Sequence, residues 1–311
     1  MKVLTRRTRA GWRRAVITVG VFDGVHLAHQ RLLRRTMALA RRTGSASVAV
    51  TFHPDPYHVL APQEAPPALM SLQARLRHLA ASGLDATVVV QFTRAFARIR
   101  AERFVREFLV RRLRAAAIVV GDNFTFGQGR HGDVRTLRAA AAAAGARVFI
   151  VPPVMRGGSL VSASRIRRLI QAGKLRAARA LLGHAPTLGG RVVQGAGRGR
   201  RLGFPTANIR LQDQVVPPHG VYAVRARLEP GVPGARPWPA VMNLGTRPTF
   251  GGGAVSCEVH VLGRRGAWLG RTLSLELVQR LRGEQCFPSL ASLQHQIRRD
   301  IARARQRLAR R

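Results

Sequence analysis

The sequence has few cysteines, few lysines and few acidic residues, and it has no long apolar run. Its two cysteines, Cys257 and Cys286, fit neither a disulfide framework nor the spacing of a metal site, which favours a reducing, cytoplasmic compartment. No apolar run is long enough to span a bilayer, so we expect no membrane partner. The Arg-rich N-terminus leads directly into an apolar run that starts at Val16, and we therefore expect no cleaved signal segment.

The scarcity of acids leaves a large positive charge. There are 53 basic residues against 14 acidic ones, a net charge of +39, and only Lys2 and Lys174 are lysines. Arginine-rich surfaces bind nucleic acids through their phosphates. A GC-rich genome produces the same bias, however, and the arginines are spread along the whole chain. We expect nucleic-acid binding only as a non-specific effect of charge, and a basic nucleic-acid-binding protein without enzyme activity is kept as an alternative.

The chain of 311 residues is long enough for two domains that each bury a core. Residues 1–183 alternate β-branched runs with amphipathic segments such as Ala101–Arg114, which predicts an α/β domain whose parallel sheet is covered on both faces. Residues 184–311 carry short apolar runs such as Val255–Leu262, separated by glycine and proline, and these predict an antiparallel barrel. A basic amphipathic helix is expected over Leu290–Leu308.

One motif follows the first predicted strand. Its members are Gly20, Phe22, Asp23, Gly24, His26 and His29. A buried strand, a glycine turn and a helix N-terminus in this order form an anion pocket. His26 and His29 lie about one turn apart on the same helix face, where their imidazoles can bond phosphate oxygens beside the free backbone N–H groups. A structural turn with incidental histidines explains these residues equally well.

Two more stretches of the first domain carry polar side chains. Residues 121–132 follow another predicted strand and hold Asn123 among aromatic rings, which suit a planar ligand, although an ordered loop is the alternative. Since the carboxyl ends of parallel strands meet at one edge, this loop should lie beside the first motif. Ser162, Ser164, Arg165 and Arg167 open a helix, either as routine caps or as a site for a triphosphate and its leaving pyrophosphate.

The richest stretch of the second domain is residues 190–209. Gly195, Gly197 and Gly203 let the backbone approach phosphates closely. Thr206 and Asn208 alternate along one strand and offer two neutral oxygens to a hard cation such as Mg²⁺. Glu258 lies in a β-run that is almost devoid of other acids. It is either a solvated surface residue or, beside a phosphate site, a general base.

The first motif is similar to the phosphate-binding signature of the nucleotidyltransferase superfamily. Over nearly its whole length the chain resembles the bacterial bifunctional riboflavin kinase/FMN adenylyltransferase (FAD synthetase) family, with motifs of both domains in the expected order. The resemblance implies a Rossmann-like nucleotidyltransferase domain over residues 1–183 that adenylylates FMN to FAD and releases pyrophosphate. It implies a six-stranded riboflavin kinase barrel with a C-terminal helix over residues 184–311 that phosphorylates riboflavin to FMN and releases ADP. ATP is the co-substrate of both steps, and these small molecules are the only partners implied.

The resemblance also carries roles to individual residues. The positions that match the ATP and FMN site of the first domain are Gly20, Phe22, Asp23, Gly24, His26, His29, Asn123, Ser162, Ser164, Arg165 and Arg167. The positions that match the ATP and flavin site of the second are Gly195, Gly197, Gly203, Pro205, Thr206, Asn208, Asn243, Arg247 and Glu258. His26 and His29 are implied as catalytic in the first site. In the second, Thr206 and Asn208 hold Mg²⁺ and Glu258 is the base.

The sequence departs from the family pattern at several positions. Ala28 stands where a glycine is usual, Asp55 where Pro-His-Pro has its histidine, and Ala163 where Ser-Ser-Thr has its second serine. In the barrel, residues 263–270 replace an acidic turn. The kinase residues Thr206, Asn208 and Glu258 are intact, so a kinase-only enzyme with a degenerate first domain is a further alternative.

Overall fold

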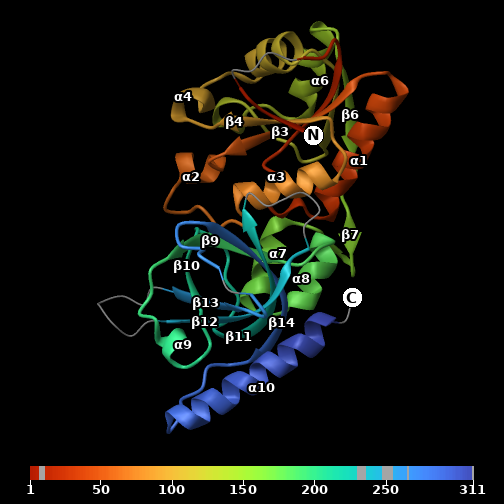
Figure 1. The fold of residues 1–311 in the computed structure, drawn as a ribbon. Coiled ribbons are helices and arrows are strands. Elements are labelled where there is room, and N and C mark those ends of the chain that lie inside the picture. The colour runs from red at the N-terminus through yellow and green to blue at the C-terminus, as the bar shows by residue number, and fades with distance from the viewer. Residues whose placement is uncertain (7–10, 230–235, 247–254, 265, 310–311) are drawn as a thin grey trace. The chain divides into compact units, whose positions relative to one another are not determined.

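The computed structural model describes residues 1–6, 11–229, 236–246, 255–264 and 266–309. The chain forms two compact units, one of residues 1–66 and 75–162 and the other of residues 67–74 and 163–311 (Figure 1). Each unit has its own sheet and its own hydrophobic core. The assignment of the two activities to residues 1–183 and 184–311 stays a prediction.

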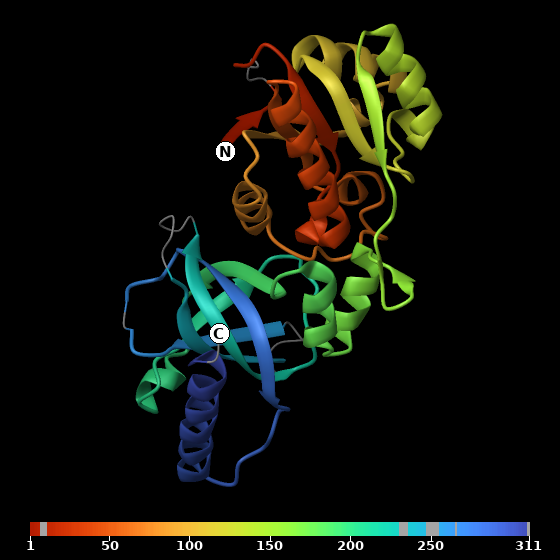
Figure 2. The same ribbon diagram turned by 90° about the vertical axis from the view of Figure 1, so that its right-hand side faces the viewer.

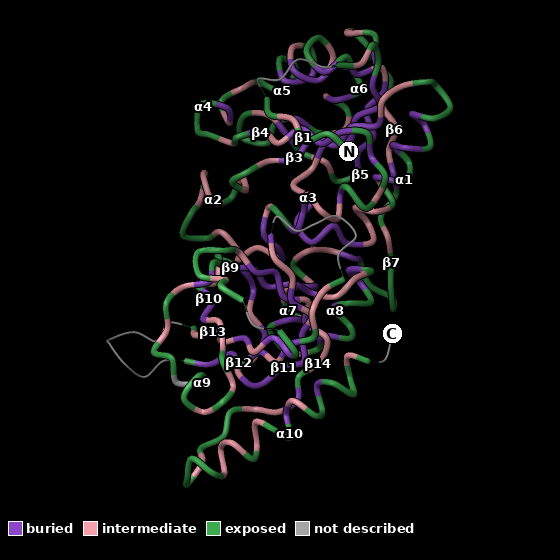
Figure 3. The backbone as a smooth tube through the Cα atoms, viewed as in Figure 1, coloured by how far each residue is buried: buried purple, intermediate pink, exposed green. Residues whose placement is uncertain are grey.

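The first unit contains a six-stranded parallel sheet in the order β1-β4-β3-β2-β5-β6. Its strands are β1 (Lys2–Thr5), β2 (Ala15–Val19), β3 (Ala46–His53), β4 (Ala86–Gln91), β5 (Ala115–Gly121) and β6 (Arg147–Val151). All five residues of β2 are buried, as expected for a central strand covered on both faces. Buried stretches run through the interior of both units in Figure 3. The strand order reverses at β2, between β3 and β5, and ligands of open α/β sheets bind at such a switch point.

Helices cover both faces of this sheet. The helices before residue 150 are η1 (Asp23–Val25), α1 (Leu27–Arg42), α2 (Pro56–Leu60), α3 (Leu72–Ala81), α4 (Arg94–Ala97), α5 (Ala101–Arg103), η2 (Phe104–Arg112), η3 (Gln128–Arg130) and α6 (Val134–Ala143). Because side chains alternate along a strand, Val16 packs on one face with Leu39 and Ala40 of α1, whereas Ile17 packs on the other with η2 and α6. Figure 2 shows α1, in orange-red, running along the sheet. A short hairpin of β7 (Met155–Arg156) and β8 (Ser159–Leu160) follows.

One predicted helix differs in its winding. The pattern over Ala101–Arg114 predicts an ordinary α-helix, but after α5 the chain continues as the π-helix η2. The N–H of Leu113 donates to the oxygen of Phe108, five residues earlier. The rings of Phe104 and Phe108 stack with their centroids 5.6 Å apart, and both rings face the core. The apolar pattern gave no sign of this, because the buried positions are compatible with either winding.

The second unit is a closed six-stranded barrel in the order β10-β13-β12-β11-β14-β9, which confirms the predicted fold. Its strands are β9 (Thr187–Val193), β10 (Ala207–Leu211), β11 (Gly220–Glu229), β12 (Trp238–Thr246), β13 (Val255–Val261) and β14 (Thr272–Arg282). Its helices are α7 (Ala163–Gln171), α8 (Leu175–Leu182), α9 (Arg198–Arg201) and α10 (Leu290–Ala309). The closed barrel leaves no free strand edge among these six strands.

Helix α10 is held against the barrel by a buried ion pair. The Nε of Arg282 donates to Oδ2 of Asp300 at 2.8 Å, and Gln296 donates to the other carboxylate oxygen at 2.9 Å. Asp300 is only 2% exposed. Ala304, one turn further along α10, packs with Val221 of β11. The polar and apolar contacts together fix the helix on strands β11, β12 and β14.

Two candidate active sites

The loop after β2, residues 20–26, is the first candidate site. It contains left-handed backbone at Phe22 (φ 55°), Gly24 (φ 79°) and Val25 (φ 37°). Such angles are costly at residues other than glycine and persist only where the surroundings hold them. Here the ring of Phe22 is fully buried and Gln30 donates to the carbonyl of Val25 at 2.9 Å. The loop is therefore a fixed element of the sheet edge.

The two histidines of the motif lie together at the start of α1. His26 is the N-cap residue, and its ring stacks on that of His29 with a centroid separation of 3.7 Å. Burial lowers the pKa of His29 well below its usual value, and the charges of His26 and Arg75 lower it further. His29 is therefore neutral at pH 7, with one N–H to donate. Together with the free N–H groups of the first helical turn, this geometry suits phosphate oxygens.

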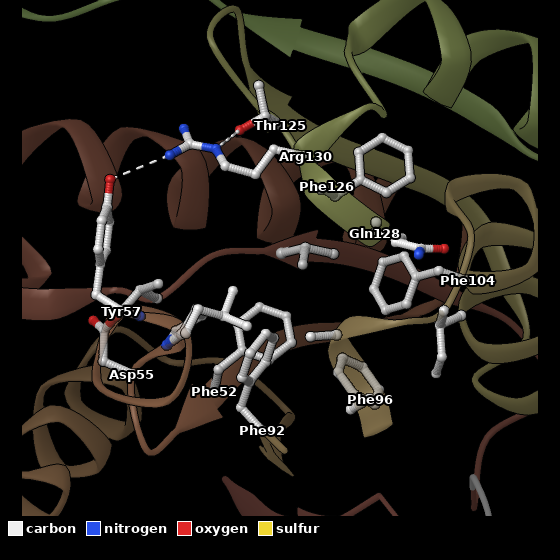
Figure 4. A pocket seen from close by; sticks show the side chains of 18 of the residues that line it. Phe52, Asp55, Tyr57, Phe92, Phe96, Phe104, Thr125, Phe126, Gln128 and Arg130 are labelled. Carbon is white, nitrogen blue, oxygen red and sulfur yellow. Dashed lines mark hydrogen bonds between the residues drawn. The ribbon is translucent and has the colours of Figure 1, made fainter. Parts of the chain in front are cut away.

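A cavity of about 770 Å³ opens beside this loop within the first unit. Its wall is aromatic, and Figure 4 shows the rings of Phe52, Phe92, Phe96, Phe104 and Phe126 around it. Aromatic walls of this kind accept a planar ring system.

Part of the cavity wall is polar. Arg130 donates to the hydroxyls of Tyr57 at 3.2 Å and Thr125 at 3.1 Å, as drawn in Figure 4. Gly20 and Asn123 line the cavity, so the loops after β2 and β5 meet there, whereas His26 and His29 are not among its lining residues. The sequence pointed to the loop around Asn123 but missed Phe92 and Phe96, which follow β4. Their spacing carried no sign of a site, because single aromatic residues near strand ends are ordinary core residues.

The remaining predicted residues of this site lie around the boundary of the two units. Ser162 is the last residue of the first unit, while Ser164, Arg165 and Arg167 lie on α7 in the second. There the Nε of Arg167 donates to the carbonyl of Pro67 at 2.7 Å. A role for these four residues in phosphate binding stays a prediction. Asp55, one of the departures from the family pattern, caps α2 by accepting the N–H of Tyr57 at 2.9 Å.

The second candidate site lies on the outside of the barrel. Cys257 and Val259 fill the interior, so Glu258 between them faces outward. Glu258 is the direct cross-strand partner of Asn208 in β10 and of Asn243 in β12. The hydroxyl of Thr206 lies 3.5 Å from Oε2 of Glu258. Four of the predicted residues thus form one polar row across three strands.

Glycines make room beside this row. A Cβ on Gly195 would overlap the side-chain amide of Asn208, and one on Gly199 would press on the hydroxyl of Thr206. Gly197 (φ 67°) and Gly203 (φ 86°) adopt left-handed backbone that favours glycine. The loop is closed by a bond from the N–H of Phe204 to the carbonyl of Gly199 at 2.8 Å.

Pro205 and Arg247 are the two other residues predicted for this face. The ring Nδ1 of His260 lies 2.8 Å from the carbonyl oxygen of Pro205, which ties the loop to β13. Arg247 lies outside the described residues.

The oxygens of Thr206 and Asn208 fit a hard cation. Across the described residues, no three His, Cys, Asp or Glu side chains are grouped as metal ligands. The donors present are a neutral hydroxyl and a neutral amide, beside a carboxylate and against glycines that leave space. Mg²⁺ is commonly held by few protein oxygens together with substrate phosphates and water, which matches this donor set.

Comparison with known proteins identifies both domains. A family model described as FAD synthetase matches residues 8–165, and one described as riboflavin kinase matches residues 182–308. The chain is 39% identical over 291 residues to the bifunctional riboflavin kinase/FMN adenylyltransferase of Escherichia coli K12, covering 94% of this chain and 92% of that protein. The chain belongs to this family. It is also 36% identical to the family member of Pseudomonas fluorescens, covering 94% and 93% of the two chains.

A solved structure shares the fold as well. The crystal structure described as a macrolide-efflux protein from Streptococcus pneumoniae matches with a TM-score of 0.82 at 28% identity, covering 98% of this chain and 99% of that one. Within the described part of the present chain, none of the helices combines the length and the apolar character needed to cross a membrane.

Proposed function

We propose that this chain makes FAD from riboflavin in two steps. The barrel, within residues 184–311, transfers the γ-phosphoryl group of ATP to riboflavin and releases ADP and FMN. The Rossmann-like domain, within residues 1–183, transfers the adenylyl group of a second ATP to FMN and releases pyrophosphate and FAD. The observation that carries the proposal is the row of Thr206, Asn208, Glu258 and Asn243 on one face of the barrel.

In the kinase step, Glu258 accepts the proton of the riboflavin 5′-hydroxyl while that oxygen attacks the γ-phosphorus. The backbone of the glycine-bearing loop, residues 195–203, accommodates the ATP phosphates. Thr206 and Asn208 would hold Mg²⁺, which supplies charge neutralisation on the phosphates when bound. Asn243, directly opposite Glu258, is positioned to orient the carboxylate or the substrate hydroxyl.

In the adenylyl transfer, a phosphate oxygen of FMN attacks the α-phosphorus of ATP and the bond to the leaving pyrophosphate breaks. His26 and His29, with the N-terminus of α1, donate hydrogen bonds to the phosphates. The aromatic cavity accepts the isoalloxazine ring, with Asn123 at its edge. The family resemblance assigns Arg165 and Arg167 to the departing pyrophosphate.

The experiment that tests the proposal is incubation of the purified chain with riboflavin, ATP and Mg²⁺, followed by separation of the flavins. FMN should appear first and FAD second. If FMN forms but FAD does not, and if supplied FMN is not converted to FAD either, the result would support the kinase-only alternative. Absence of both products, with steeply salt-dependent binding of DNA or RNA, would favour the nucleic-acid-binding alternative.

We also propose a cytoplasmic location. Both cysteines are free thiols, Cys257 inside the barrel and Cys286 exposed. The thiols fit a reducing compartment. Fractionation of cells expressing the tagged chain would test this location.

A further inference from the structure

Arg75 is a buried cation beneath the first site. It lies on α3 and is only 3% exposed. Its Nη1 donates to the carbonyl of Phe52 at 3.0 Å and to the hydroxyl of Thr51 at 3.3 Å, both at the end of β3. Its Nε is buried and has no hydrogen-bond partner among the described residues. Burying a guanidinium costs free energy, so an arginine retained at such a position calls for a physical reason.

Thr51 connects this arginine to the loop after β2. The Thr51 side chain is fully buried, accepts from Arg75, and donates to the carbonyl of Val21 at 2.8 Å. Val21 directly precedes Phe22, the first of the left-handed residues of the loop. The bond from the N–H of Gly20 to the carbonyl of Val50 at 3.1 Å extends the β2–β3 pairing up to the same point. The chain of bonds from Arg75 through Thr51 thus ends where the loop acquires its unusual backbone.

The charge of Arg75 also acts on the histidines. After burial and His26, it is the third cause of the lowered pKa of His29. After burial, it is the largest cause of the lowered pKa of His53, to which His58 also contributes.

Two carboxylates face the same guanidinium. Asp23 and Asp55 favour its charged form, although burial lowers the pKa of Arg75 overall. An arginine stays protonated at neutral pH even so. Two carboxylates therefore offset the charge of Arg75, which still repels a proton on the nearby imidazoles.

We propose that Arg75 is a positioning residue for adenylyl transfer: through Thr51 it fixes the loop at residues 20–26, and its charge acts on the imidazole of His29. This inference rests on the proposed synthesis of FAD. Because Arg75 is buried, its guanidinium cannot contact a bound nucleotide directly. It acts through the loop and through His29. A neutral His29 keeps one ring nitrogen as donor and one as acceptor, which fixes how it meets a phosphate oxygen.

Four variants separate the two effects. Arg75→Met removes both the bonds and the charge, whereas Arg75→Lys keeps the charge. Thr51→Val cuts the connection to Val21 and leaves the charge in place. Arg42→Met is the matched control, because it removes one exposed arginine at the C-terminal end of α1, whereas His29 lies at the N-terminal end of that helix.

The first measurement is FAD formation from supplied FMN, with riboflavin phosphorylation by the same preparation as reference. For Arg75→Met and Thr51→Val, kcat should fall about 10- to 100-fold, the loss expected when reacting groups are displaced by about 1 Å. Arg75→Lys should recover part of the rate, and Arg42→Met should match the wild type. All four variants should phosphorylate riboflavin at the wild-type rate. Wild-type FAD formation by Arg75→Met or Thr51→Val would overturn the inference.

The second measurement is the titration of the His29 imidazole by NMR, assigned with His29→Ala. The midpoint should rise in Arg75→Met, because a nearby like charge has been removed. It should stay at the wild-type value in Thr51→Val, Arg75→Lys and Arg42→Met. A midpoint that does not move in Arg75→Met would overturn the role of the charge.

The two measurements distinguish a failure of the role of Arg75 from a failure of the proposed function. A wild-type chain that makes no FAD would refute the proposed adenylyl transfer, while the titration would still decide whether Arg75 controls His29. If Arg75→Met fails to fold, Thr51→Val decides the role of the loop contact. The charge is then tested with Arg75→Gln, whose side chain can still donate to the carbonyl of Phe52, by the same titration.

Discussion

Replacing Glu258 with Gln tests the base assigned to the kinase step. Glutamine has the same shape, so the cross-strand pairs with Asn208 and Asn243 should persist. The hydroxyl of Thr206, 3.5 Å away, makes at most a weak bond whose loss changes the free energy of unfolding little. Removing a general base lowers a rate by about 10²- to 10⁴-fold, which corresponds to roughly 3–5 kcal/mol of barrier. Riboflavin phosphorylation by Glu258→Gln should fall by this amount.

The assay follows FMN formation from riboflavin and, separately, FAD formation from supplied FMN. Glu276→Gln is the matched control, since Glu276 is a partly exposed glutamate of β14 that pairs with Arg227 at 2.7 Å and not with the polar row. The control should phosphorylate riboflavin normally, and both variants should form FAD at the wild-type rate. If Glu258→Gln keeps more than about a tenth of the kinase rate, a base role at this position is wrong. Loss of both activities in a folded Glu258→Gln variant would contradict two separate sites.

Three more substitutions test other parts of the structure. His29→Ala should abolish FAD formation from FMN but leave FMN formation intact, and FAD formation at the wild-type rate would exclude His29 from the site. Gly195→Ala adds a Cβ that overlaps the Asn208 amide, so kinase kcat should drop about 10-fold or more with FAD formation unchanged; an unaffected kinase would show that this loop is not part of the site. Asp300→Ala leaves the partly buried Arg282 without its carboxylate and should lower the free energy of unfolding of the barrel by about 2–3 kcal/mol in chemical denaturation, whereas a change under about 1 kcal/mol would show that the pair is solvated.

The sequence was most informative where a pattern has one structural solution. The β-branched run at Val16 predicted a buried strand that ends in a glycine turn, and the fully buried strand β2 lies there. On the barrel, the two-residue spacing of Thr206 and Asn208 placed both on one face. The prediction that Glu258 joins them came from the resemblance, since an isolated acid on a strand is ordinarily a surface residue. Pairing of β10 with β13 supplies the proximity that spacing along the chain could not.

The parts that escaped prediction depend on contacts between distant segments. Arg75 sits in an amphipathic helix pattern where a solvent-facing arginine is the normal outcome, and only the packing of α3 against β3 buries it. The aromatic cavity gathers rings from β3, the segment after β4, η2 and the loop after β5. No local rule brings Phe52 and Phe126 together. These features can be seen only in the tertiary structure. They are also the features that distinguish a ligand-binding site from a purely structural turn.

The two sites differ in charge for a chemical reason. The nucleophile of the kinase step is an alcohol, which must lose its proton to attack phosphorus, and in the proposed site Glu258 would accept that proton beside neutral oxygens. The nucleophile of the adenylyl transfer is a phosphate monoester, whose second pKa is about 6, so it is already deprotonated at neutral pH. That step needs no base, only groups that neutralise and align phosphates. In the proposed site, the N-terminus of α1 and the two stacked imidazoles would align the phosphates by donating hydrogen bonds, while the buried Arg75 would hold the loop in place.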